Sequence, residues 1–152
     1  MSAPPISKPG PKPAMNSSPI DTSADTARFL LAADGPTELV DEHRHLLEAI
    51  GSPVLHMGEL GSAAVIKVIT NMRAFIHLVS VGEALMLAKR GGLDLAKSYE
   101  AILHSSGNSF VHETEGQVIL NGSYNIGFTM DLACKDLGFA TQFGREFGVP
   151  LD

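Results

Sequence analysis

A long apolar stretch from Ser62 to Lys89 dominates the hydrophobic pattern of this chain. Apolar side chains fall on every face of a helix drawn through it, and Arg90-Gly91-Gly92 supplies a stop signal. At 1.5 Å per residue such a helix is about 40 Å long. Because a helix that is apolar nearly all round needs cover on every side, we predict that it lies at the centre of the fold.

Three shorter helical patterns follow the long one. Asp94 is a suitable N-cap for the first, whose apolar positions are Leu95, Tyr99, Ile102 and Leu103. The second extends from about Ser109 to Leu120, and the third from about Asp131 to Phe147. Glycines follow both of these helices closely, as is typical of helix ends. The chain beyond Gly61 is therefore predicted to be helical.

The segment before Gly58 has a different pattern, strand–helix–strand. Ala27–Ala33 predicts a short buried strand, and Pro53–Met57 predicts a second. Between them we expect one helix, which starts at Pro36, ends at Gly51 and has an apolar face of Leu39, Val40, Leu46, Leu47 and Ile50. This order is typical of the edge of an α/β sheet, although the segment is too small to form a domain alone.

The first 25 residues contain six of the nine prolines, which predicts an extended or disordered arm. The predicted fold class is therefore mainly α: a helical domain around one long central helix, preceded by a small strand–helix–strand remnant. We expect residues 1–57 to form the arm and the remnant, and residues 58–152 to form the helical domain.

Composition and charge exclude several classes of protein. A net charge of −6 and a pI near 5.4 argue against a nucleic-acid surface. Cys134 is the single cysteine, which excludes an internal disulfide and fits a reducing compartment. The N-terminus lacks the apolar stretch of a signal peptide. Charged and polar side chains interrupt the long apolar helix too often for a membrane span. We predict a soluble, cytoplasmic protein.

Lys67 and Asn71 are the polar pair that needs a reason within this helix. They are four residues apart, so they lie on one helix face, among apolar neighbours. One interpretation is a lysine that extends its ammonium to solvent from an apolar helix. The other is a partly buried lysine whose desolvation suits it to proton transfer near neutral pH.

These two residues belong to a set of short motifs that recur in a fixed order. The motifs are Pro5-Ile6-Ser7 with Gly10-Pro11 and Ala14; Gly58-x-x-Gly61-Ser62 with Lys67-x-x-x-Asn71; Glu83-Ala84-Leu85-x-Leu87-Ala88 with Gly92-Leu93-Asp94; and Phe128-x-x-x-Leu132-x-x-Lys135-Asp136-Leu137. The set resembles the β-hydroxyacid dehydrogenases, the family that includes 3-hydroxyisobutyrate dehydrogenase and glyoxylate reductase. The resemblance covers nearly the whole chain.

The resemblance implies roles for four side chains. Lys67 would be the general acid/base at the substrate hydroxyl or carbonyl, and Asn71 would orient the substrate. Ser7 would bind the substrate carboxylate, and Lys135 would lie beside the nicotinamide of NAD or NADP. From the residues alone, Lys135 is an exposed helix lysine next to Asp136, and Ser7 belongs to the proline-rich arm.

One departure from the family changes the expected function. The nucleotide-binding half of the family opens with a strand and a glycine-rich phosphate turn, and this sequence has no G-x-G-x-x-G motif. We expect the chain to begin near the end of that Rossmann half and to stop before the last helices of the family. It would then be the catalytic and dimerisation portion, similar to the C-terminal part of 6-phosphogluconate dehydrogenase.

Two functional hypotheses remain. The first is an NAD(P)-dependent β-hydroxyacid dehydrogenase, present as an incomplete chain and inactive alone. The second is a non-catalytic helical dimerisation module derived from this family. The resemblance implies a homodimer and a small hydroxyacid, and the missing Lys-x-x-His-Asn arrangement of 6-phosphogluconate dehydrogenase favours one without phosphate. We expect no metal site, since His43 and His45 point to opposite sides of their predicted helix.

Overall fold

The computed structural model describes residues 30–123, 125 and 127–151. The proline-rich arm, Ser7 and the first part of the predicted strand at 27–33 lie outside these residues. The elements, in chain order, are β1 (Leu31–Ala33), α1 (Thr37–Glu42), α2 (Arg44–Ile50), β2 (Val54–His56), α3 (Ser62–Arg90), α4 (Leu95–Leu103), α5 (Phe110–Asn121) and α6 (Met130–Phe147). The predicted fold class is confirmed: helices predominate, and a small strand segment precedes them.

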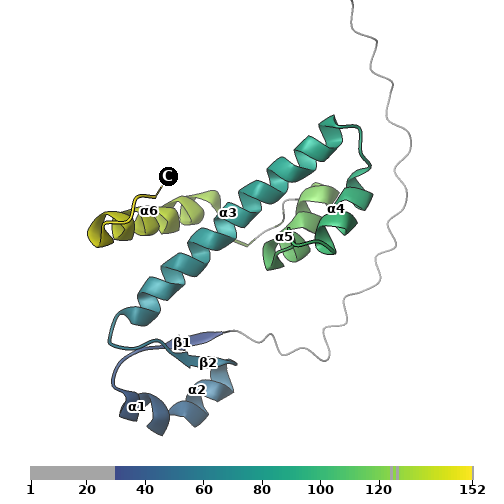
Figure 1. Ribbon diagram of the computed structural model, residues 1–152. Helices are drawn as coiled ribbons and strands as arrows, with labels where there is room; N and C mark the ends of the chain where they lie inside the picture. The colour runs from purple at the N-terminus through teal and green to yellow at the C-terminus, as the bar shows by residue number, and fades with distance from the viewer. Residues whose placement is uncertain (1–29, 124, 126, 152) are drawn as a thin grey trace, which may run out of the picture.

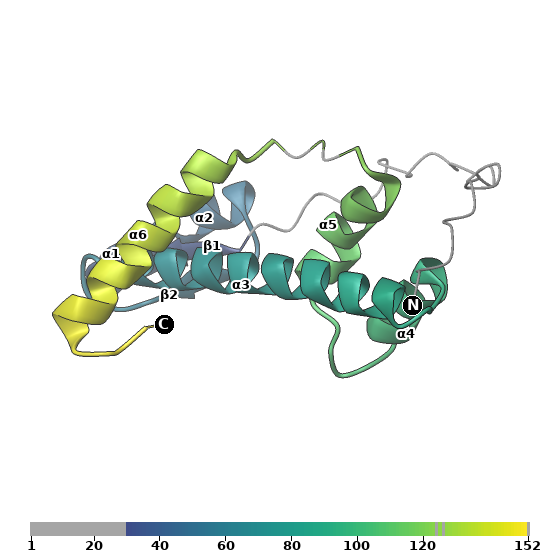
Figure 2. The same cartoon turned by 90° about the horizontal axis from the view of Figure 1, so that it is seen from above.

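Helix α3 forms the axis of the fold, as the apolar stretch predicts (Figure 1). It ends at Arg90, one residue later than expected, and Gly91 follows. The sheet with α1 and α2 lies at its N-terminal end. Helices α4 and α5 pack along its C-terminal half, and α6 packs against its N-terminal half (Figures 1 and 2). Helices α5 and α6 both pack against α3, and the candidate site described below lies where they meet it.

Helices α4, α5 and α6, which follow α3, each begin at a side-chain cap. Asp94 accepts from the backbone N–H of Lys97, and Ser109 accepts from that of His112. Thr129 Oγ1 accepts from the backbone N–H of Leu132 at the start of α6. Each cap satisfies an N–H group that has no partner within its own helix, which fixes where the helix starts.

The α4–α5 hairpin contains the most enclosed side chain of the described residues. His112 is fully buried, and its ring stacks on that of Tyr99 at 4.4 Å between centroids. Its Nε2 donates to the Tyr99 carbonyl oxygen over 3.0 Å, which leaves Nδ1 buried and without a partner. A Cβ at Gly116 would come within 3.2 Å of the Tyr99 ring, so only glycine permits this approach without a shift.

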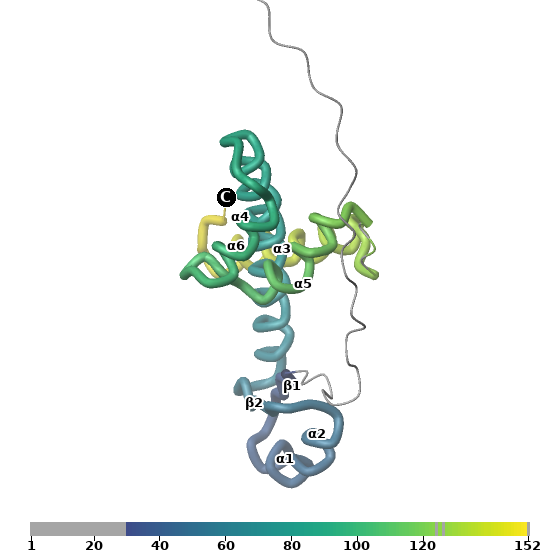
Figure 3. The backbone as a smooth tube through the Cα atoms, turned by 90° about the vertical axis from the view of Figure 1, so that its right-hand side faces the viewer, coloured from purple at the N-terminus to yellow at the C-terminus, as the bar shows by residue number. Residues whose placement is uncertain are grey.

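The strand segment is a two-stranded parallel sheet in the order β1-β2. Leu31 pairs with Val54, and Ala33 pairs with His56. Both strands are shorter than predicted, with three residues each. In Figure 3 the segment extends beyond the end of α3, away from the other helices.

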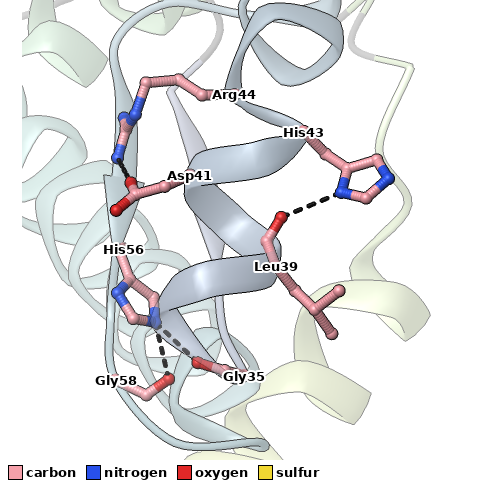
Figure 4. Close-up of polar contacts among 7 residues, drawn as sticks. All are labelled: Gly35, Leu39, Asp41, His43, Arg44, His56 and Gly58. Carbon is pink, nitrogen blue, oxygen red and sulfur yellow. Dashed lines mark hydrogen bonds and ion pairs between the residues drawn. The ribbon is translucent and has the colours of Figure 1, made fainter.

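The prediction of a single helix in this segment was wrong. Instead of one helix from Pro36 to Gly51, two short helices meet at His43, which leaves the helical conformation with φ −100° and ψ 7°. At this break the His43 backbone N–H and its ring Nδ1 both donate to the Leu39 carbonyl oxygen, over 3.1 and 3.0 Å (Figure 4). Of the predicted apolar face, only Val40 is buried.

The described chain alone does not cover α3 on every side. Only Val81 and Leu85 of this helix are buried, whereas Ile76 is 55% exposed and Leu87 75% exposed. Three helices and a small sheet are too few to surround α3. By length and composition alone, α3 could cross a membrane, a criterion that core helices of soluble proteins also meet.

Candidate functional site

Lys67 and Asn71 contact each other on the face of α3 that looks toward α6. Lys67 Nζ donates to Asn71 Oδ1 over 2.9 Å. The contact follows from the four-residue spacing, which places the two side chains one helical turn apart. The expected burial of the lysine is not found, since Lys67 is exposed in the described chain. Of the two interpretations above, exposure matches the first, and the hydrogen bond to Asn71 fixes where the ammonium lies.

The second contact of Asn71 crosses to α6. Its Nδ2 donates to Asp136 Oδ2 over 2.7 Å, although the two residues are 65 positions apart in the chain. The other carboxylate oxygen of Asp136 lies 3.3 Å from Lys135 Nζ. Asp136 is only 16% exposed, whereas Lys135 is 56% exposed. The structure therefore connects Lys67, Asn71, Asp136 and Lys135 in one polar network between two helices.

Asp136 belongs to one of the sequence motifs, but the sequence alone predicted no role for it. Its position along the predicted helix is the feature that could have indicated an inward-facing side chain. Asp136 lies three residues after Ala133 and four before Ala140, so a helix places it on one face with these two buried side chains. An inward-facing carboxylate requires a donor, and the nearest polar group on α3 is the Asn71 amide.

A cavity of about 340 Å³ opens beside Lys67 and Asn71. Its walls come from α3, α5, α6 and the turn before α6, and are mostly apolar: Ala74, Phe75, Leu78, Val111, Phe128, Met130 and Ala133. Phe75 and Phe128 contact each other at 5.6 Å between ring centroids and close one end. Apart from Lys67, Asn71 and Thr129, the polar group at this cavity is the Glu115 carboxylate. An apolar pocket with a few convergent polar groups is the usual form of a small-molecule site.

Two of the four predicted site residues line this cavity. Lys135 reaches the site only through Asp136, and its ammonium lies 5.9 Å from the centroid of the Phe139 ring. Ser7 lies outside the described residues. Lys67 and Asn71 thus line one cavity, Lys135 is connected to them only through Asp136, and the roles of all three stay predictions.

A separate set of hydrogen bonds fixes the start of α3. Asp34 Oδ2 accepts from the backbone N–H groups of Gly61 and Ala63, over 2.8 and 3.0 Å. His56 Nε2 lies 2.8 Å from the Gly35 carbonyl oxygen and 3.1 Å from that of Gly58, so it donates between them (Figure 4). These contacts hold the sheet against the end of the helix that carries Lys67.

No group of three or more histidine, cysteine or acidic side chains that could hold a metal ion occurs among the described residues. The two histidines weighed above are separated by the helix break. His43 is the residue at that break, and its Nδ1 is engaged by Leu39.

Comparison with known proteins identifies the family. Residues 61–152 match the model described as NAD-binding of NADP-dependent 3-hydroxyisobutyrate dehydrogenase. The chain belongs to this family, and the resemblance to β-hydroxyacid dehydrogenases seen in the sequence motifs is confirmed. The cofactor prediction, NAD or NADP, is confirmed at the level of the family.

Similar proteins are dehydrogenases of small hydroxyacids. The 2-(hydroxymethyl)glutarate dehydrogenase of Eubacterium barkeri is 36% identical over 132 residues, covering 86% of this chain and 44% of that protein. The L-threonate dehydrogenase of Cupriavidus necator is 31% identical, covering 84% and 43%. A solved 3-hydroxyisobutyrate dehydrogenase from Salmonella typhimurium superposes with a TM-score of 0.71 at 28% identity, covering 78% and 42%. The chain spans less than half the length of these relatives.

The described residues at the start of α3 do not offer a phosphate site for such a cofactor. A pyrophosphate requires free backbone N–H groups at a glycine-rich turn and a helix N-terminus. After β1, Pro36 has no N–H to offer, and the Asp34 carboxylate already occupies the N–H groups of Gly61 and Ala63 at the start of α3. The placement of Lys135 beside the nicotinamide stays a prediction from the family resemblance.

Proposed function

We propose that this chain is the acid/base half of an NAD(P)-dependent β-hydroxyacid dehydrogenase, with Lys67 as the general acid/base. The supporting observation is the hydrogen bond from Lys67 to Asn71 at the edge of a mostly apolar cavity. When bound, the nicotinamide supplies or accepts the hydride at the substrate carbon. The protein must supply the proton at the substrate oxygen, and a lysine at the cavity edge has the chemistry to do so.

Each residue of the network has a distinct proposed task. Lys67 gives a proton to the carbonyl oxygen during reduction and takes it from the hydroxyl during oxidation. Asn71 holds the lysine ammonium and orients the substrate, and Lys135 places a positive charge next to the nicotinamide. The apolar walls around Phe75 and Phe128 keep water from the reacting carbon. Ser7 binds the substrate carboxylate.

The proposed substrate is a small hydroxyacid without phosphate. The cavity holds about 340 Å³, and Lys67 is the one cation among the residues that line it. A phosphate ester needs several donors or cations, as in arginine clusters or helix N-termini. The relatives named above act on hydroxyacids according to their names, which supports the same class here.

The proposed assembly is a homodimer through α3 and its neighbouring helices. Ile76, Val79 and Leu87 leave a large apolar surface exposed on α3, which a second subunit would cover. The proposed division lies between residues 57 and 58, where the strand segment meets the helical part. The relatives support a soluble protein, and we place it in the cytoplasm because its single cysteine fits a reducing compartment.

The second candidate is a non-catalytic dimerisation module. The specific observation in its favour is that the described part of the nucleotide-binding region is a two-stranded sheet with two short helices. This segment offers no complete phosphate site. We therefore expect the chain alone to show no dehydrogenase turnover and no micromolar binding of NAD or NADP.

Two experiments test these proposals. Spectrophotometry of the chain with NAD and NADP against 3-hydroxyisobutyrate, glycerate and 4-hydroxybutyrate should show no rate, and a rate abolished by Lys67→Ala would refute the expected inactivity. The acid/base role is tested in a chimaera with the nucleotide-binding half of the Salmonella enzyme. There Lys67→Ala should lower kcat at least 100-fold, with Lys89→Ala as the matched control. A chimaera that remains active with Lys67→Ala would reject the acid/base role.

A further inference from the structure

The Asn71 amide lies between two groups with opposite hydrogen-bonding requirements. A lysine ammonium only donates, and an ionised carboxylate only accepts. An amide has one oxygen and one NH₂ group and can be turned by 180° about its χ2 bond. Here the oxygen faces Lys67 at 2.9 Å and the nitrogen faces Asp136 at 2.7 Å. Only this orientation satisfies both neighbours, so the assignment of the two amide atoms follows from the chemistry of the neighbours.

We propose that Asp136 is a positioning residue, which fixes the orientation of the Asn71 amide and thereby presents its oxygen to Lys67. The inference rests on the proposed function only in that Lys67 is the acid/base group. Asp136 suits this task because it is largely buried and hydrogen bonds to charged acceptors are stronger than neutral ones. With Asp136 absent, the exposed Lys67 ammonium alone would select the amide orientation, so the selection would be weaker.

The same carboxylate also holds the second lysine. Its other oxygen lies 3.3 Å from Lys135 Nζ in an ion pair, so the two carboxylate oxygens face different partners. Lys67 on α3 and Lys135 on α6 are therefore linked through a single buried acid. Asp136 thus sets the relative placement of two lysines that the proposed function assigns to the substrate and to the cofactor.

The first test observes the amide and the lysine directly in the full chain. The side-chain NH₂ signals of Asn71 are identified by NMR through their loss in Asn71→Ser. In Asp136→Ala we expect their solvent exchange to become at least about tenfold faster, the factor for loss of a hydrogen bond to a charged group. Acetylation of Lys67 by acetic anhydride, measured by mass spectrometry against Lys97 on α4, should rise at least about twofold.

A matched variant and a fold control accompany this test. Glu146→Gln removes a different acid from the same helix and should leave both readouts unchanged. Circular dichroism establishes that Asp136→Ala retains its helices. If the amide exchange and the Lys67 acetylation of a folded Asp136→Ala protein equal those of the unchanged chain, the proposal is wrong.

The second test exchanges the partners and does not depend on Asp136→Ala being folded. Asn71→Asp alone places two carboxylates in contact and should lower the Tm. Adding Asp136→Asn restores a donor facing an acceptor and should recover most of the loss. Adding Asp136→Ala instead only removes the repulsion and should recover less. Equal recovery by the two double variants would overturn the proposal.

Neither test requires nucleotide, substrate or turnover. Each can therefore succeed or fail independently of the proposed function. Asp136-dependent amide orientation together with an active Lys67→Ala chimaera would leave the positioning inference standing and reject the acid/base role. Unchanged readouts together with an inactive Lys67→Ala chimaera would do the reverse.

Discussion

The α4–α5 hairpin and the β1–β2 segment contrast in how they are stabilised. The hairpin encloses His112 completely, stacks it on Tyr99 and caps both helices with side chains. The strand segment buries only Val40, leaves Leu39, Leu46 and Ile50 exposed, and begins neither helix with a side-chain cap. Local sequence is enough to build the hairpin against α3. The strand segment has an apolar surface that its own residues do not cover, as expected of the edge of a larger sheet.

The largest predicted effect tests directly whether the hairpin is better packed than the strand segment. His112→Ala removes a fully buried ring and leaves a cavity between α4 and α5, so we expect a loss of about 2–3 kcal/mol in the free energy of unfolding. Ile50→Ala in the strand segment, where the side chain is 72% exposed, should cost less than about 0.5 kcal/mol. Urea denaturation followed by circular dichroism measures both. Similar costs for the two variants would show that the hairpin is no better packed than the strand segment.

An intermediate effect is expected at the C-terminal helix. A Cβ at Gly144 would lie 2.9 Å from the Val149 carbonyl oxygen and 3.0 Å from the Leu151 side chain, whereas one at Gly138 would meet nothing. Both positions are on α6. Gly144→Ala should therefore destabilise by about 1–2 kcal/mol through overpacking, and Gly138→Ala should stabilise by up to about 1 kcal/mol through helix propensity. Thermal unfolding of the pair decides this, and the same sign of ΔTm for both would contradict it.

The smallest predicted effect concerns the link between the two regions. Asp34→Ala removes the acceptor for two N–H groups at the start of α3 and should cost about 1 kcal/mol, the usual value of an N-terminal cap. Hydrogen exchange should become faster at Gly61 and Ala63 while the middle of α3 is unaffected. Asp41→Ala, which breaks only an exposed ion pair with Arg44, is the control and should have little effect.

Much of the helical part could be predicted from the sequence because its signals are local. The apolar stretch located α3 within one residue, and Asp94 located the start of α4. The paired face of Lys67 and Asn71 followed from their spacing alone. The family could be inferred from four motifs in order, and the match over residues 61–152 agrees with it.

The errors arose where tertiary contacts decide. The break lies at His43, which leaves the helical conformation, and a change of backbone conformation at one residue is not detected by periodicity. The contact of Asp136 with Asn71 joins residues 65 positions apart, so no local pattern identified Asp136 as part of the site. The exposure of α3 is not such an error, because one chain offers too few elements to surround this helix.

The segment between β2 and α3 has a mechanical consequence. Gly58 and Gly61 both have positive φ, at 115° and 101°, where a side chain would be strained, so the backbone there turns at two closely spaced points. Such a segment is a natural hinge, and the Asp34 carboxylate bridges it from the strand side to the helix side. A bridge worth about 1 kcal/mol in total would be open in about one molecule in six. The sheet would then swing as a unit about the end of α3, while the Lys67 network, beyond the hinge, keeps its geometry.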